Sequence, residues 1–127
     1  MPERSDPHGA PRVLALTDLL FGARIRAAAQ TANVDVIVLR TPAALVAAAV
    51  ERAPRRILID LDARGHDPVD VIRSLKDDAR TSEVDVVAFV SHVREDAIRA
   101  ARDAGADRVL ARSAFVRQLP DLVNVEA

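Results

Sequence analysis

Five short apolar runs recur along the chain, each separated from the next by a longer segment of mixed polarity. The runs are Val13–Leu16, Val36–Leu39, Ile57–Ile59, Val86–Val90 and Val109–Ala111. Most of them are nearly continuous in Val, Ile and Leu, which is typical of strands buried on both faces of a parallel sheet. The pattern therefore predicts five strands whose two faces are both covered.

The segments between the runs have the spacing of amphipathic helices. Thr41-Pro42 and Asp67-Pro68 each place a polar cap before a proline, a pair that favours the start of a helix. Gly105 follows the fourth helical segment and is predicted to end it. The apolar faces of the first and fourth helices are predicted to contain Phe21, Ile25, Ala28, Ala29 and Ala32, and Val93, Ala97, Ala100, Ala101 and Ala104.

A fifth helix is expected over Phe115 to Val123, where Pro120 should break or shorten it because proline has no backbone N–H. Strand and helix thus alternate five times, which predicts right-handed βαβ units around one parallel sheet. The fold class is therefore α/β, with a doubly wound five-stranded sheet.

Length and composition narrow the picture further. The 127 residues suit one domain, and we expect a flexible tail over residues 1–11 and the domain over residues 12–124, with no output domain after the last helix. A net charge of −1 with interspersed signs predicts no nucleic-acid partner and no membrane surface. The chain has no cysteine and no apolar core of a signal peptide, so we expect a cytoplasmic protein.

Polar side chains follow four of the five predicted strands. Asp18 follows the first, Asp60 ends the third, Ser91 ends the fourth and Arg112 ends the fifth. The carboxyl ends of parallel strands meet at one edge, where open α/β sheets bind ligands. Asp62 lies two residues beyond Asp60. Carboxylates, a hydroxyl and a cation at one edge suit a divalent cation and a phosphoryl group.

Four segments of the chain resemble the receiver domains of two-component response regulators. They are Val13–Asp18, Ile57–Asp60, Val69–Lys76 and Ala100–Asp107. The resemblance implies a flavodoxin-like fold with strand order 2-1-3-4-5. It also implies that Asp60 accepts the phosphoryl group, that Asp18, Asp60 and the backbone carbonyl of Asp62 bind Mg²⁺, that Ser91 and Arg112 contact the phosphoryl group, and that no organic cofactor is present.

The chain departs from the receiver pattern at several of these positions. Receivers usually end the first strand with two acids, but Thr17 precedes Asp18 here. The usual Lys-Pro is Arg112-Ser113, and this bond should be trans because a non-proline cis bond costs about 3–4 kcal/mol. Val109 replaces the aromatic switch residue of the fifth strand. Two further departures are His92 after the hydroxyl residue and Arg64 in place of a proline.

These departures favour an atypical receiver, or pseudo-receiver, that acts mainly through protein–protein interaction with weak or absent phosphorylation and is not an enzyme. One alternative is a working receiver that accepts a phosphoryl group on Asp60 from a histidine kinase. A second is a small-molecule-binding domain of the same architecture. The expected partner is a histidine kinase or a downstream signalling protein, with a homodimer included, and the expected contact surface is the fourth helix, the fifth strand and the fifth helix.

Simpler structural roles compete with the functional ones at several positions. Asp62 is expected to be a solvated loop residue, and Ser91 to cap the following helix as readily as to bind a phosphoryl group. Arg112 is expected to pair with the carboxylate of Asp60 or Asp18 as a structural ion pair. Leu19 and Leu20 are expected to pack under neighbouring loops, the alternative being an exposed apolar contact for a partner. His66 and His92 are expected on the loop surface.

Overall fold

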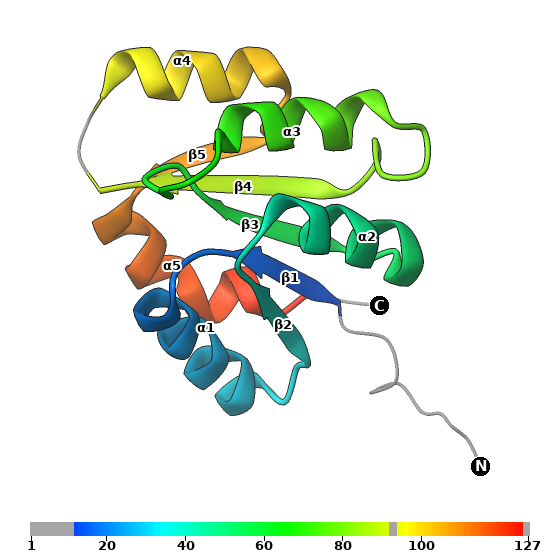
Figure 1. Cartoon of the computed structure of the whole chain (residues 1–127). Coiled ribbons are helices and arrows are strands. Elements are labelled where there is room, and N and C mark those ends of the chain that lie inside the picture. The colour runs from blue at the N-terminus through cyan, green and yellow to red at the C-terminus, as the bar shows by residue number, and fades with distance from the viewer. Residues whose placement is uncertain (1–11, 92–93, 126–127) are drawn as a thin grey trace.

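The computed structural model describes residues 12–91 and 94–125 and contains one parallel sheet of five strands (Figure 1). The strand order is β2-β1-β3-β4-β5, as the resemblance implied. The strands are β1 (Val13–Leu16), β2 (Val36–Leu39), β3 (Arg56–Asp60), β4 (Asp85–Val90) and β5 (Arg108–Ala111). The five predicted strands are confirmed, and three of them are longer than predicted by one or two residues.

Five helices cover the two faces of the sheet, two on one face and three on the other (Figure 1). They are α1 (Leu19–Ala32), α2 (Pro42–Arg52), α3 (Pro68–Asp77), α4 (Glu95–Ala104) and α5 (Arg112–Val123). Helices α2, α3 and α4 pack with one set of strand side chains, and α1 and α5 pack with the other. The molecule is therefore a three-layer α/β sandwich.

Alternation along the strands divides the core into these two halves. In β1, Leu14 and Leu16 face the helices of one layer while Val13 and Ala15 face those of the other. All four side chains have no exposed surface. Successive side chains of a strand point to opposite faces, so a continuous apolar run serves two cores at once.

The helix boundaries predicted at Thr41, Asp67 and Gly105 are confirmed, whereas α5 begins at Arg112, before the predicted Phe115. Thr41 accepts a hydrogen bond from the Ala44 N–H, and Asp67 accepts one from the Val69 N–H. Gly105 ends α4 with φ of 114°, in the left-handed region that suits glycine. The local signals for helix starts and stops therefore agree with the tertiary packing.

The predicted break in the fifth helix is wrong. Helix α5 runs without interruption from Arg112 to Val123 and includes Pro120. Proline costs about 3 kcal/mol in a helix interior, whereas each large side chain that is fully buried contributes about 1.5–3 kcal/mol. The helix buries four of them, Phe115, Leu119, Leu122 and Val123, and Pro120 itself is exposed. Packing therefore outweighs the loss of one backbone donor.

Some sequence predictions lie outside the described residues, namely the N-terminal tail over residues 1–11, His92 and Val93. In the part of the chain that the structure describes, no helix combines the length and the apolar character needed to cross a membrane.

Candidate functional site

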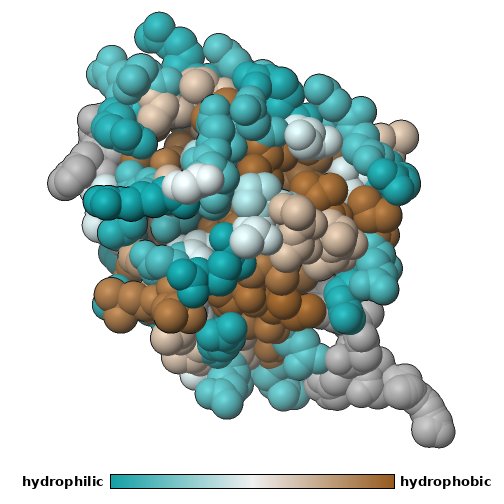
Figure 2. All heavy atoms as spheres, viewed as in Figure 1, coloured by the Kyte–Doolittle hydropathy of each residue, from teal (hydrophilic) through white to brown (hydrophobic). Residues whose placement is uncertain are grey.

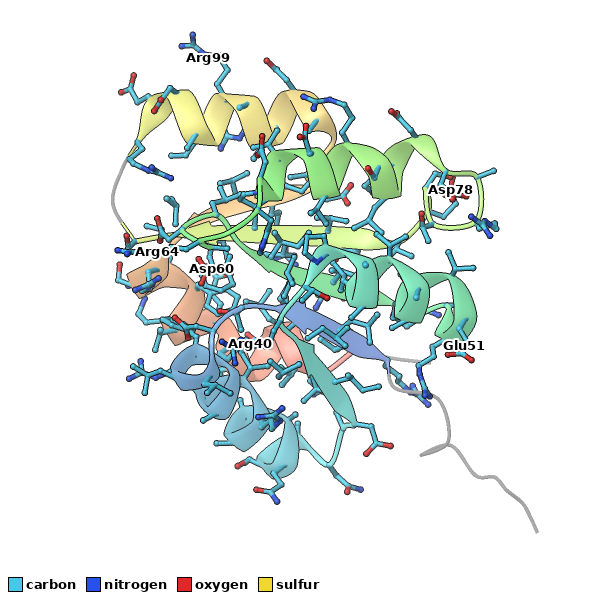
Figure 3. The ribbon with its side chains drawn as sticks, viewed as in Figure 1. Arg40, Glu51, Asp60, Arg64, Asp78 and Arg99 are labelled. Atoms are coloured by element: carbon cyan, nitrogen blue, oxygen red, sulfur yellow. The ribbon has the colours of Figure 1, made fainter. Side chains whose placement is uncertain are left out.

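The carboxyl ends of the strands bring Asp60 and the neighbouring loops to one edge of the sheet. Figure 3 shows Asp60 and Arg64 at this edge, while Asp78 lies at the opposite end of the molecule. Asp60 is the last residue of β3, and Arg112 is the first residue of α5, directly after β5. The edge of the sheet therefore holds a carboxylate from the end of β3 and a cation from the start of α5.

Asp60 is enclosed and both of its carboxylate oxygens accept hydrogen bonds. The residue is 2% exposed. The Thr17 hydroxyl donates to Oδ2 at 2.9 Å, and the Asp62 N–H donates to Oδ1 at 2.8 Å. Burial raises the pKa of Asp60 above its ordinary value of 3.8, although the two hydrogen bonds and the charge of Arg112 oppose the rise. Asp60 is a satisfied, buried carboxyl group.

The Asp62 carboxylate is the centre of the contacts at this edge. Its Oδ2 accepts the Ser91 N–H at 2.6 Å and lies 3.2 Å from Nη2 of Arg112. Its Oδ1 lies 3.7 Å from Nη2 of Arg94. The side chain is 24% exposed, so the expectation of a solvated loop residue is wrong. Asp62 joins the segments that follow β3, β4 and β5.

Arg112 points inward, toward the two carboxylates. Its Nη2 lies 3.2 Å from Asp62 Oδ2 and 4.0 Å from Asp60 Oδ1, so the closer ion pair is with Asp62 and not with the predicted partners Asp60 or Asp18. The guanidinium carbon lies 4.5 Å from the centre of the Phe21 ring, within the range of a cation–π contact. The Arg112–Ser113 peptide bond is trans, as predicted.

The Phe21 ring belongs to an aromatic cluster beneath the site. Phe89 and Phe115 stack with ring centres 3.9 Å apart, and Phe21 lies 5.2 Å from Phe89. These are the three aromatic residues of the chain. Arg112 is therefore held between two carboxylates and a buried apolar base, where the mutual attraction of the charges is less screened than at the surface.

Asp18 begins α1 rather than contacting the other acids. Its Oδ1 accepts the Phe21 N–H at 2.8 Å, and the residue is exposed. The following Leu19 and Leu20 are 64% and 80% exposed. The expectation that these two leucines pack under loops is therefore wrong, and the exposed apolar surface that was its alternative is what the structure shows.

Ser91 contributes its backbone to the site. Its N–H donates to Asp62, and the N-cap position of α4 is occupied by Arg94, so the expected capping role of Ser91 is wrong. Val109 is half-buried on the face of the sheet that packs against α2, α3 and α4. His66 is half-buried with its Nε2 enclosed, which differs from the surface position expected for it.

The set of ligands implied for Mg²⁺ does not fit a divalent cation as these side chains stand. Asp18 caps a helix, both Asp60 oxygens accept hydrogen bonds, and a guanidinium lies beside Asp60 and Asp62. Within residues 12–91 and 94–125, no three His, Asp or Glu side chains come together as metal ligands would. A Mg²⁺ site at these residues stays a prediction.

Sequence reasoning did not find two residues of this site. Thr17 was noted only as a missing acid, yet its hydroxyl contacts the buried Asp60. Arg94 carried no signal, because a cation in the loop before a helix is common on any surface. The useful signal for Thr17 was its position: a polar residue at the end of a buried strand needs a partner.

Comparisons with known proteins agree on the fold. No protein-family model matches the chain, and no curated protein matches it. A Mn²⁺-bound form of the response regulator Rcp1 is 22% identical over 90% of each chain, with a TM-score of 0.70. The chemotaxis response regulator CheY4 of Vibrio cholerae is 12% identical over 88% of this chain and 94% of that one, with a TM-score of 0.77.

A response-regulator receiver domain from Bermanella marisrubri gives a similar result. It is 22% identical over 91% of this chain and 99% of that one, with a TM-score of 0.75. Likeness at such identities shows architecture and not activity. The chain therefore has the flavodoxin-like fold of the receiver domains of response regulators.

Proposed function

We propose that this chain is an atypical receiver of cytoplasmic signal transduction that acts through protein contacts, with weak or absent phosphorylation at Asp60. The observation that carries the proposal is the enclosure of Asp60. An acceptor carboxylate attacks phosphorus through an oxygen lone pair, so that oxygen must reach the donor. Here the residue is 2% exposed, so a donor has little access to either oxygen, and each oxygen already accepts one hydrogen bond.

The cation beside Asp60 supports the same proposal. Arg112 is engaged by Asp62 at 3.2 Å and rests on Phe21. A guanidinium is a planar fork whose hydrogen bonds have fixed directions, whereas a lysine ammonium is a compact point charge. Turning Arg112 toward a phosphoryl group would break its contact with Asp62, which lowers the gain from phosphorylation.

Protein contact is favoured by the exposed apolar residues next to the site. Leu19 and Leu20 expose most of their side chains at the start of α1, directly after the strand that ends at the site. Figure 2 shows apolar surface in the region where Figure 1 places α1 and β2. Apolar surface of this kind marks sites that another protein covers. The partner is proposed to be a histidine kinase or a downstream signalling protein.

The test is labelling by a small phosphodonor. The chain is incubated with acetyl phosphate and Mg²⁺, and intact-protein mass spectrometry measures the fraction that gains one phosphoryl group. We expect no Mg²⁺-dependent gain in the wild type. A working receiver is the competing function: it would show a Mg²⁺-dependent adduct that Asp60→Asn removes, and that result would replace the present proposal.

A double variant provides a matched comparison. Thr17→Asp with Arg112→Lys rebuilds two features that the resemblance implies for receivers, the acid pair and the lysine. Both changes act on Asp60 directly, through the contacts at 2.9 Å and 4.0 Å. We expect labelling of this variant to exceed that of the wild type. Equal and substantial labelling of the two proteins would show that neither contact restrains Asp60.

A further inference from the structure

One backbone N–H and two guanidinium groups surround the Asp62 carboxylate. The Ser91 N–H comes from the segment after β4, Arg94 precedes α4, and Arg112 begins α5. The loop between β4 and α4 supplies the first two groups and the start of α5 supplies the third, and they approach one carboxylate at 2.6, 3.7 and 3.2 Å. Two guanidinium groups and a backbone N–H are also the groups that bind the oxygens of phosphate in proteins.

The chain supplies the anion itself. Asp62 Oδ2 takes both the backbone N–H and the Arg112 contact, while Oδ1 faces Arg94. The Asp62 N–H donates to Asp60, which fixes the backbone of Asp62 against the end of β3. The carboxylate is thus presented to its donors by a short and anchored stretch of chain.

We propose that the Ser91 N–H, Arg94 and Arg112 form an anion site that the Asp62 carboxylate occupies permanently, in place of an external tetrahedral oxyanion. This inference rests on the proposed function, because it explains how the loops after β3, β4 and β5 are joined without a phosphoryl group. A ligand shifts a conformational equilibrium only if it binds one state better than another. Because the Asp62 carboxylate is part of the chain, it holds the loops after β3, β4 and β5 together at all times.

The inference predicts that removal of the carboxylate opens the site to inorganic phosphate. In Asp62→Ala, the Ser91 N–H and the two guanidinium groups lose their contacts with the carboxylate and can donate hydrogen bonds to the oxygens of phosphate. We expect a saturable shift of the Ser91 amide signal in ¹H–¹⁵N spectra on phosphate titration, with an affinity at least tenfold above that of the wild type. The hydrogen-exchange rate of the Ser91 amide in phosphate-free buffer should also rise.

The matched control is Asp70→Ala. Asp70 pairs with Arg73 on the exposed side of α3, so its removal changes the net charge equally and leaves the Asp62 contacts intact. We expect this variant to bind phosphate as weakly as the wild type. If Asp70→Ala gains as much affinity as Asp62→Ala, the effect is general attraction of anions, and the proposal is overturned.

A second variant guards against a folding defect. Asp62→Asn keeps the volume and one oxygen that can accept from Ser91, but it removes the charge that holds Arg94 and Arg112. It should bind phosphate more tightly than the wild type, and adding Arg112→Gln should remove that gain. A folded Asp62→Asn protein without any gain overturns the proposal. Phosphodonor labelling at Asp60 in the wild type would instead overturn the proposed function. The phosphate titration would then still decide whether Asp62 occupies an anion site.

Discussion

Thr17 changes the chemistry of the buried Asp60 by being a hydrogen-bond donor. A second acid at this position would repel Asp60, and both would need a shared cation to stay ionised. The threonine hydroxyl instead donates to Asp60 Oδ2, and both residues are nearly inaccessible to solvent. Arg112 lies beside both Asp60 and Asp62, and Arg94 adds a second positive charge 3.7 Å from Asp62. Two guanidinium groups of the chain therefore face the two carboxylates of the site.

Asp60→Asn should leave the folded protein at least as stable as the wild type at pH 7. Burial raises the pKa of Asp60 above 3.8, so the folded state binds its proton more tightly than the unfolded state does. This group therefore favours folding most below pH 3.8, and that contribution is lost as the pH rises through the folded pKa. Asparagine stays neutral and can still accept the Asp62 N–H.

Urea unfolding at pH 7 and pH 4 measures this difference. The variant's advantage should shrink at the lower pH, where the wild-type carboxyl becomes protonated. A loss of more than about 1 kcal/mol at pH 7 would contradict the prediction and show that the Asp60–Arg112 attraction exceeds the desolvation cost. When a partner protein has been identified, its affinity for Asp60→Asn should stay within a few-fold of its affinity for the wild type.

The side chains at the edge of the sheet could be predicted only in part. Strand ends predict that Asp18, Asp60, Ser91 and Arg112 share one edge. The structure places Arg112 near Asp60 and the Ser91 N–H on Asp62, while Asp18 caps α1. The choice of Asp62 as the nearer partner of Arg112 depends on the conformation of the loop after β3. Two acids separated by one residue give the same sequence signal, so no pattern distinguishes them.

At the scale of elements, apolar periodicity and capping residues predict strands and helix starts that the structure contains, whereas Pro120 predicts a helix break that it does not contain. The five strands follow from apolar runs, and α2 and α3 begin at their predicted polar-proline pairs. Helix α5 differs because its four buried side chains hold it across Pro120. A propensity is a local preference, and tertiary burial overrides it when the buried area is large.

Among the described residues, two glycines have positive φ, and their comparison tests how α4 ends. Gly105 has φ of 114°, and a Cβ there would lie 2.8 Å from Lys76 Cγ, while Gly65 has φ of 87° and no heavy atom within 4 Å of such a Cβ. The Lys76 Nζ is held at 2.7 Å by the Val84 carbonyl and at 2.9 Å by Asp107. Lys76 therefore cannot move aside without losing contacts.

We expect Gly65→Ala to cost about 1–2 kcal/mol from backbone strain alone. Gly105→Ala should cost at least about 1 kcal/mol more, because strain and the Lys76 clash add. Chemical denaturation of the two variants measures both values. Equal losses would mean that Lys76 moves freely, and its contacts to Val84 and Asp107 would then contribute little to stability.

Among the described residues, the buried apolar side chains form two cores, and the large exposed apolar side chains, Leu19 and Leu20, lie at the start of α1. One core contains α2, α3 and α4, and the other contains α1 and α5. The alternating pattern predicted this architecture, because each strand has to satisfy both layers. The sequence predicted that Leu19 and Leu20 pack under loops, with exposure as the alternative. A helix start with three successive apolar residues can turn only some of them inward, and the structure shows the alternative.

Replacing both Leu19 and Leu20 by serine tests whether these two side chains belong to the surface or to the core. The side chains are 64% and 80% exposed, so each change should alter the free energy of unfolding by no more than about 0.5 kcal/mol. Ile25→Ala in the same helix is the control: Ile25 has no exposed surface, and its truncation should cost about 2–5 kcal/mol. Chemical denaturation compares the wild type, the double serine variant and Ile25→Ala. On hydrophobic-interaction chromatography, only the serine variant should elute earlier than the wild type. If the serine variant loses as much stability as Ile25→Ala, the leucines pack as the sequence first suggested, and the apolar surface beside Asp60 does not exist for a partner to cover.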